Sequence, residues 1–322
     1  MSERRISLIG GCLVAIGPIS LALYTPAMPT LVAAFDTSEA LVKLSLAVYF
    51  AGFAFTQLVC GPLSDAYGRR ITTIAFMVIY LAGSILAVFA PTIELVVWAR
   101  LLQGIGASVG VATARAIVRD QFTGETSSRI MNTIGIILAI GPAVSPTIGG
   151  LMLDLAGWHS LFLMMAGFGL ALIGVTIGLM RETIVPDPSR IRPKAILAAY
   201  RELATNRHFL ATSLTVAGSV GALYTLATVL PFVLIDVAGL TPTEYGIGML
   251  AQSGSFLCGS IAARFLMTRF GAYRLVPVGL GLIGVGAAAM AVSIQILPVS
   301  YVSIMGPMGF YAFGIALVMP AM

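Results

Sequence analysis

Charged side chains are scarce in this sequence. Of its 322 residues, 18 are Lys or Arg and 13 are Asp or Glu, which leaves only 10% of the chain charged. A soluble domain of ordinary composition has charge on about a quarter of its residues. The deficit excludes a soluble enzyme, a disordered tail and a nucleic-acid-binding protein.

Histidine and cysteine are also rare, with two and three copies. Cys12, Cys60 and Cys258 each lie in an apolar run, which argues against a disulfide framework. The sequence has no HExxH, no CxxC pair and no GxxxxGK[ST] motif, so no metal, haem or nucleotide site is visible. We therefore expect a protein without cofactors that is not an enzyme.

Apolar residues are abundant instead. They make up 58% of the chain, and the mean hydropathy is +1.00. About 20 apolar residues in a helix cross the hydrocarbon core of a bilayer, and ten runs are long enough: 6–28, 41–63, 71–90, 94–116, 130–152, 160–180, 209–235, 244–267, 275–296 and 299–321. These runs predict an all-α membrane protein with ten transmembrane helices.

The basic residues predict the orientation of these spans. With the N-terminus in the cytoplasm, every Lys and Arg except Lys43 and Arg100 falls inside the cell or at an inner helix end. Basic residues collect on the cytoplasmic side of membrane proteins. We expect a multi-pass membrane protein with a cytoplasmic N-terminus.

One long polar stretch divides the spans into two groups. Residues 181–208 contain three prolines and nine charged residues, which is typical of a cytoplasmic linker. Within it, residues 195–205 are compatible with a short surface helix. The predicted domains are a six-helix bundle at 1–180 and a second bundle at 209–322.

The two bundles carry a weak internal repeat. An offset of 203 residues superposes Leu63 on Leu266, Tyr67 on Phe270 and Gly68 on Gly271. Both segments join the second and third spans of their bundle, as expected for the parallel repeats of secondary transporters. By the same offset Met322 corresponds to residue 119, so the second bundle would contain only the first four of six helices, ten of twelve in all.

The loop between the second and third spans has features of a gate. Gly61 would let the second span end tightly, and Gly68 is a natural turn position. The carboxylate of Asp65 can pair with Arg69 or Arg70 in one conformation and release it in another. The alternative is a basic loop that only sets topology.

Arg100 is an isolated charge about six residues inside the fourth span. An arginine at the middle of a membrane costs about 2.5–3.5 kcal/mol on insertion scales. Such a residue is expected to face a cavity or a carbonyl, with Gln103 on the same helix face and Gly104 beside it. We assign these three residues to energy coupling; the alternative is that Arg100 extends to the outer surface.

The fifth span combines two prolines with several glycines. Pro142 and Pro146 each remove a backbone donor and bend the helix. Gly141, Gly149 and Gly150 permit close approach to a neighbouring helix. This favours a bent helix that pivots against its partner or seals a leak.

Apart from Arg100, the predicted spans have no deep charge, so an uncharged cavity is expected. Its candidate lining residues are Tyr24, Tyr49, Gln57, Arg115, Met131, Asn132, Tyr224 and Gln252. Among them, Arg115 near the inner end of span four either attracts anionic groups or anchors at headgroups. Aromatic and Met surfaces adapt to many apolar ligands, which predicts small amphipathic substrates.

Three segments resemble signatures of the major facilitator superfamily. The signature of its loop 2–3 is resembled by Gly61-x-Leu63-Ser64-Asp65-x-x-Gly68-Arg69-Arg70, and that of its fourth helix by Arg100-x-x-Gln103-Gly104-x-Gly106. The fifth-helix signature of its antiporters is resembled by Gly141-Pro142-x-x-Ser145-Pro146-x-x-Gly149-Gly150. Two further segments, Tyr24-Thr25-Pro26-Ala27-Met28-Pro29 and Gly157-Trp158-His159, resemble the bicyclomycin/chloramphenicol-resistance group of drug:proton antiporters.

The resemblance implies a major-facilitator fold, alternating access, and export of drug-like molecules in exchange for protons by a monomer in the lipid bilayer of the bacterial inner membrane. One position departs from the group, because Ala22 stands where an acid is frequent, so the proton-carrying residue is not identified. Two alternatives stay open: a facilitator or importer of a metabolite with the same fold, and a truncated fragment that does not transport.

Overall fold

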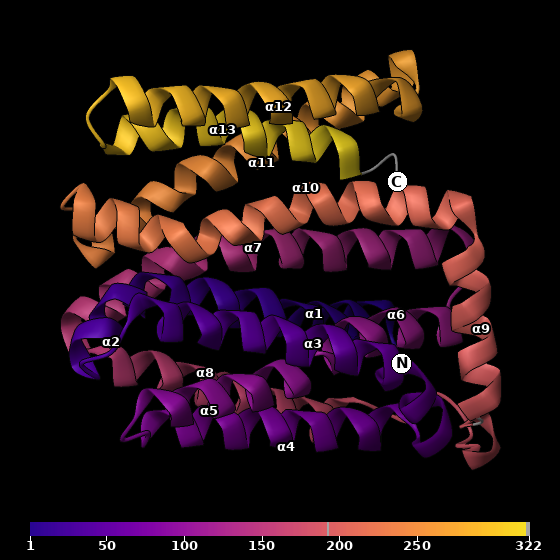
Figure 1. Cartoon of the computed structure of the whole chain (residues 1–322). Coiled ribbons are helices and arrows are strands. Elements are labelled where there is room, and N and C mark those ends of the chain that lie inside the picture. The colour runs from indigo at the N-terminus through magenta and orange to yellow at the C-terminus, as the bar shows by residue number, and fades with distance from the viewer. Residues whose placement is uncertain (192, 320–322) are drawn as a thin grey trace. The chain divides into compact units, whose positions relative to one another are not determined.

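A computed structural model describes residues 1–191 and 193–319 (Figure 1). Arg192 of the predicted linker and Met322 of the repeat arithmetic lie outside the described residues. Within those described ranges, all regular secondary structure is helical. The chain forms two compact units, Met1–Arg192 and Pro193–Met322, so the predicted linker contributes residues to both.

Ten helical segments of the described chain are long and apolar enough to cross a membrane, and each overlaps one predicted span. They are Glu3–Ala34, Glu39–Tyr67, Arg69–Val88, Ile93–Gln121, Gly124–Ala156, Trp158–Leu179, Arg207–Val237, Pro242–Phe270, Tyr273–Ile296 and Tyr301–Val318. The prediction of an all-α membrane protein with ten spans is confirmed.

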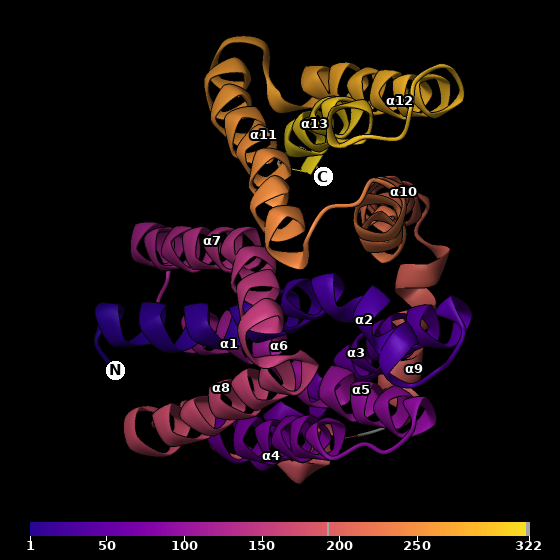
Figure 2. The same cartoon turned by 90° about the vertical axis from the view of Figure 1, so that its left-hand side faces the viewer.

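The first unit contains six of these spans, two of which are interrupted. Its helices are α1 (Glu3–Tyr24), η1 (Thr25–Ala27), α2 (Met28–Ala34), α3 (Glu39–Tyr67), α4 (Arg69–Val88), α5 (Ile93–Ala107), α6 (Val109–Gln121), α7 (Gly124–Ala156), α8 (Trp158–Leu179) and η2 (Pro188–Arg190). Helix α1 packs on α6 and α7, α3 on α5, and α4 on both α5 and α8 (Figure 2). This packing buries the face of α5 that carries Arg100 and Gln103.

The prediction that Gly61 ends the second span is wrong. Helix α3 continues through Gly61 and Pro62 to Tyr67, and the chain turns at Gly68, whose φ is +97°. The apolar run stops near residue 63, but backbone hydrogen bonding continues until a residue adopts a left-handed conformation that glycine tolerates. Asp65 therefore lies on the last turn of a helix rather than in a loop.

The second unit contains the remaining four spans. Its helices are α9 (Pro193–Thr205), α10 (Arg207–Pro231), the π-helix η3 (Phe232–Val237), α11 (Pro242–Phe270), α12 (Ala272–Ile296) and α13 (Tyr301–Val318). Helix α9 includes the helix expected at 195–205. Helices α12 and α11 both pack on α13. Side chains cap three of the helices: Asn206 caps α10, Thr241 caps α11 and Ser300 caps α13.

The internal repeat is visible in the helices themselves. Helices α3 and α11 both have 29 residues, and their ends differ by the predicted offset of 203. Each is followed by a glycine with a left-handed backbone, Gly68 at φ +97° and Gly271 at φ +85°. The two glycines cap α4 and α12 with nearly the same ψ, 147° and 149°.

A single offset does not hold to the end of the chain. Helix α12 has 25 residues where α4 has 20, so the offset rises to 208 in α13. The packing supports this register. Gly83 of α4 lies against the Ala99 carbonyl and the Gln103 amide.

At the corresponding place in the second unit, Gly286 of α12 lies against the Pro307 carbonyl and the Tyr311 amide. The glycines differ by 203 residues and their partners on the next span by 208. The arithmetic that paired the chain end with residue 119 therefore misplaces the last span by five residues, because the extra turn of α12 leaves no sequence signature.

Candidate functional site

Arg100 lies at the centre of the first unit, where its side chain is fully buried. Its guanidinium carbon lies 4.5 Å from the ring centroid of Tyr24 and 4.2 Å from that of Tyr49. These cation–π contacts join α5 to the end of α1 and the middle of α3, and they stabilise the cation most where water is excluded. Arg100 does not extend to the outer surface, so that alternative is not what this structure shows.

Gln103 holds one corner of the guanidinium. The Arg100 Nη1 donates to Gln103 Oε1 at 2.7 Å, and Gln103 Nε2 donates to Ser84 Oγ at 2.8 Å. The Met165 sulfur lies 3.5 Å from Gln103 Nε2 and 4.0 Å from Arg100 Nη1. The sequence predicted the proximity of Gln103, but nothing in it indicated Ser84 of α4 or Met165 of α8.

The two tyrosine rings are fixed by their hydroxyls. The Tyr24 hydroxyl is 2.6 Å from Ser45 Oγ, and the Tyr49 hydroxyl donates to the Gly17 carbonyl at 2.9 Å. Both tyrosines are at most 2% exposed. In this structure, both proposed cavity residues therefore contact Arg100 and form part of its surroundings.

Two nitrogens of Arg100 have no hydrogen-bond partner among the described residues. These are Nε and Nη2, and both are buried. Arg100 also forms no ion pair within the described part of the chain. We call Arg100, Gln103, Tyr24, Tyr49, Ser84 and Met165 the Arg100 cluster. It is a buried positive charge that lacks a carboxylate.

Gly104 brings α5 close to α3. A Cβ atom at this position would overlap the backbone carbonyl of Tyr49. Small residues allow helix backbones to approach in this way. The close contact places the Tyr49 ring beside Arg100, so the role of Gly104 is to position Tyr49.

A second group of polar residues lies where α3 turns into α4. Arg69 pairs with Asp65 at 2.5 Å and with Asp120 at 3.1 Å, and it donates to Ser64 Oγ at 2.9 Å. The Arg69 side chain is only 3% exposed. Asp120 was not among the residues predicted from the sequence, although its place after the basic residues at the predicted inner end of span four was an available signal.

Glu182 completes this network from the segment after α8. Its carboxylate accepts hydrogen bonds from the Arg69 amide at 2.8 Å and the Arg70 amide at 3.1 Å. A carboxylate at a helix N-terminus satisfies free donors and complements the helix dipole. The Arg70 side chain donates instead to the Ile177 carbonyl at 2.7 Å, so Arg69, and not Arg70, is the partner of Asp65.

Gly68 is required here for two reasons. Its φ of +97° is unfavourable for other residues, and a Cβ atom would lie 2.5 Å from Glu182 Oε2. Gly61, by contrast, has open space beside its Cα. We call Asp65, Arg69, Asp120 and Glu182 the inner network.

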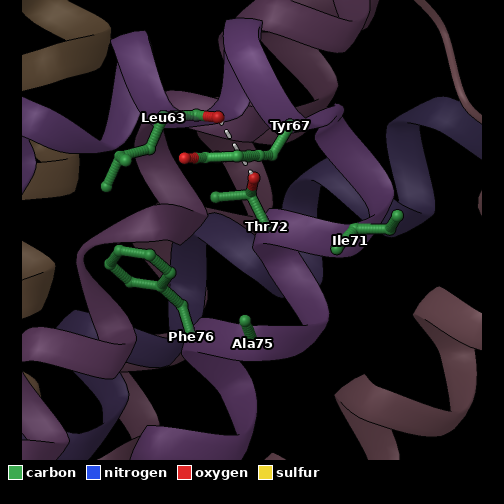
Figure 3. A pocket seen from close by; sticks show the side chains of 6 residues that line it. All are labelled: Leu63, Tyr67, Ile71, Thr72, Ala75 and Phe76. Carbon is green, nitrogen blue, oxygen red and sulfur yellow. Dashed lines mark hydrogen bonds between the residues drawn. The ribbon is translucent and has the colours of Figure 1, made fainter. Parts of the chain in front are cut away.

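An apolar hollow of about 180 Å³ lies beside the inner network (Figure 3). Its lining residues are Leu63, Tyr67, Ile71, Thr72, Ala75 and Phe76. The Thr72 hydroxyl donates to the Leu63 carbonyl, so its proton is not available to a ligand in the hollow. The hollow suits an apolar group and presents no charge to a ligand.

Helix α7 packs on α1 through its glycines. A Cβ atom on Gly141 would lie 2.9 Å from the Ile19 side chain, and one on Gly149 would lie 2.5 Å from the Leu23 carbonyl. Pro142 and Pro146 are inside the same helix, and Gly150 is buried. The fifth-span motif therefore lies in a close contact between two helices.

The remaining proposed cavity residues are dispersed. Arg115 on α6 and Asn132 on α7 are exposed, whereas Arg100 is buried, so the two arginines do not share a site. Gln57 and Met131 are half-buried in the first unit, and Tyr224 and Gln252 are half-buried in the second. The described residues include no group of three or more His, Cys, Asp or Glu side chains able to hold a metal ion.

Comparison with known proteins identifies the family. A family model described as the Major Facilitator Superfamily matches residues 11–322. The uncharacterized MFS-type transporter YdgK of Bacillus subtilis (strain 168) is 35% identical over 261 residues, which cover 77% of this chain and 64% of that protein. The chain thus spans less than two thirds of the length of this relative.

Two further proteins show how widely the fold is shared. The multidrug resistance protein MdtL of Salmonella paratyphi B is 27% identical over 281 residues, covering 87% of this chain and 70% of that protein. The crystal structure of a D-xylose-proton symporter has a TM-score of 0.73 at 13% identity, covering 99% of this chain and 81% of that chain. With six spans in one unit, four in the other and a family match over almost its whole length, this chain belongs to the major facilitator superfamily of multi-pass membrane transporters.

Proposed function

We propose that this protein exports small amphipathic, drug-like molecules across the bacterial inner membrane in exchange for protons, by alternating access. The observation that carries the proposal is the close contact of the proline-bearing helix α7 with α1 at Gly141 and Gly149. Such a contact excludes water while the prolines allow the helix to bend. The similarity to the multidrug resistance protein MdtL of Salmonella supports a multidrug substrate range.

In this proposal the inner network is the latch of the transport cycle. Arg69 is held by two carboxylates, and Glu182 ties the start of α4 to the segment after α8. An ion-pair network of this kind has two discrete arrangements, formed and broken, which is what a gate needs. The Arg100 cluster is the coupling element, because its charge is the one most isolated from water.

The N-terminus is cytoplasmic in this proposal, residues 181–208 form a cytoplasmic linker, and the protein works as a monomer. The distribution of Lys and Arg supports the orientation. Labelling with an impermeant maleimide reports it, using single cysteines placed at Ser189 and Asp154 in a cysteine-free chain. We expect Ser189→Cys to react only in inside-out vesicles and Asp154→Cys only in intact cells; the opposite pattern would reverse the topology.

Efflux from loaded cells tests the proposed activity. Cells that express the protein are loaded with an uncharged amphipathic antibiotic, chloramphenicol, energised, and followed over time. We expect faster loss than in cells with empty vector, and a protonophore is expected to abolish the difference. If de-energised cells retain the same efflux, proton coupling is contradicted.

A metabolite facilitator is the second candidate, and one observation favours it. Ala22 supplies no acid to the first span, and no carboxylate pairs with Arg100 among the described residues. A facilitator needs no proton carrier. Counterflow in proteoliposomes separates the two, because a facilitator exchanges labelled substrate without a proton gradient at the full rate.

A further inference from the structure

The free nitrogens of Arg100 lie on one edge of its guanidinium. Nε and Nη2 both carry N–H groups that point outward on the same side, and both are buried without a hydrogen-bond partner among the described residues. Nη1, on the other side, is occupied by Gln103 Oε1 at 2.7 Å. The residue therefore keeps two parallel donors available and uses the third corner for positioning.

This edge has the geometry that a carboxylate needs. Two parallel N–H groups on a rigid plane match the two oxygens of a carboxylate, and the resulting bidentate pair is among the strongest hydrogen-bonded contacts in proteins. A neutral carbonyl or hydroxyl supplies one acceptor atom and no charge. The buried positive charge is also uncompensated, so an anion removes an electrostatic cost that a neutral ligand leaves in place.

The surroundings of Arg100 favour an organic acid over a small inorganic ion. The rings of Tyr24 and Tyr49 both approach the guanidinium. Aromatic rings contact apolar ligand bodies well. An organic cation is disfavoured, because it would bring a second positive charge against Arg100 in a water-poor site.

We propose that Arg100 is the binding residue for the carboxylate of the transported molecule, so that the substrates are amphipathic organic acids. This inference rests on the proposed export function and defines its substrate class. Arg100 is fully buried in this structure, so the carboxylate reaches the Nε–Nη2 edge in a conformation of the transport cycle that opens the cluster. Gln103 is a positioning residue, because its hydrogen bond to Nη1 fixes the orientation of the guanidinium.

Binding of three matched fluorescent probes tests the proposal on the whole chain in detergent micelles. The probes are 9-anthracenecarboxylate, 9-anthracenemethanol and 9-(aminomethyl)anthracene, which share one ring system and differ in charge. We expect the acid to bind at least about tenfold more tightly than the alcohol, since hydrogen bonds to a charged group are stronger than those between neutral groups. Acid binding no tighter than alcohol binding would overturn the proposal.

Two substitutions separate the effect of the paired Nε and Nη2 donors from that of a simple positive charge. Arg100→Gln removes both the paired donors and the charge, and we expect the preference for acid over alcohol to disappear while alcohol binding stays within about twofold. Arg100→Lys keeps the charge but loses the paired donors, and we expect it to retain only part of the preference. Full preference in either variant would overturn the assignment.

Controls distinguish this proposal from the proposed export function. Arg119→Gln removes an exposed arginine of α6 and is expected to leave the acid preference unchanged. Binding is measured without any proton gradient, so it does not depend on transport. Proton-driven export of 9-anthracenemethanol together with equal binding of acid and alcohol would reject the carboxylate site alone. Acid-selective binding without proton-driven export would reject the export function alone.

Discussion

The two repeats of this chain share a backbone plan but differ in the residues at its centre. By the offsets of 203 and 208, Tyr49 corresponds to Gln252 and Arg100 corresponds to Met308. Met308 is fully buried in an apolar cluster of the second unit, together with Tyr245 and Met249. The helix contacts on either side of these positions recur in both units, at Gly83 and Gly286 for example.

This comparison separates folding from function. The second repeat packs its fourth span with an apolar methionine, so the helix contacts do not require a charge at this position. Burying the charge of Arg100 therefore lowers the stability of the first repeat, and the contacts with Tyr24, Tyr49 and Gln103 offset part of that cost. A buried charge that the fold does not need is a candidate functional residue.

Replacing the charge tests this conclusion most strongly. Arg100→Met gives the first repeat the residue of the second, and we expect proton-driven export in vesicles to fall to the level of vesicles without the protein. Thermal unfolding in detergent is expected to show unchanged or higher stability, by as much as about 1–4 kcal/mol, because a buried charge is lost. Retained export would remove Arg100 from the mechanism, and a large loss of stability would contradict the comparison.

The reciprocal change is expected to have the largest effect on stability. Met308→Arg places a charge in the apolar cluster of the second unit, where the corresponding partner position is held by Gln252 and not by a tyrosine. We expect a loss of about 3–5 kcal/mol in unfolding free energy, as for a buried charge without compensation. Met308→Leu is the matched control, with a loss below about 1.5 kcal/mol; equal stability of the two variants would refute the prediction.

Equivalent glycines give a sharper test of the register. A Cβ atom on Gly106 would lie 2.5 Å from the Phe76 carbonyl, and one on Gly314 would lie 2.7 Å from the Gly279 carbonyl. We expect Gly106→Ala and Gly314→Ala each to lower the unfolding free energy by about 1–3 kcal/mol. Gly135→Ala is the control, because nothing lies near that Cα. Similar stability of Gly314→Ala and the control would invalidate the offset of 208.

The turn glycines predict the smallest difference. Both Gly68 and Gly271 have positive φ, so alanine at either position carries a strain of about 1–2 kcal/mol. Only Gly68 also faces the Glu182 carboxylate. We therefore expect Gly68→Ala to be the more destabilising variant by up to about 1 kcal/mol, measured by thermal unfolding.

Removing the carboxylate is the control for that difference. Glu182→Gln is expected to reduce the difference in stability between Gly68→Ala and Gly271→Ala. The neutral side chain of glutamine is held less strongly at the start of α4 than the Glu182 carboxylate, so it can move away from a Cβ atom at position 68. A gap that does not change on this background would mean that Glu182 is not its cause.

The partners of the two sites depended on tertiary structure to different degrees. Arg69 and Asp65 are only four residues apart, so the local turn at Gly68, between α3 and α4, brings them together. Asp120 and Glu182 are distant in sequence and reach Arg69 only through the packing of α6 and the path of the chain after α8. Tyr24 and Tyr49 were predicted to line a cavity, and only the structure shows that both rings lie on Arg100.

The sequence by itself determined that the described chain is helical, that ten of its segments are long and apolar enough to cross a membrane, and that its first four spans recur. Hydropathy and turn glycines are properties of short segments, which is why the sequence determines these features. Tertiary structure decided which charges meet, which edge of Arg100 stays free, and where the register of the second repeat shifts. These depend on contacts between residues far apart in the chain, whose distances no local pattern encodes.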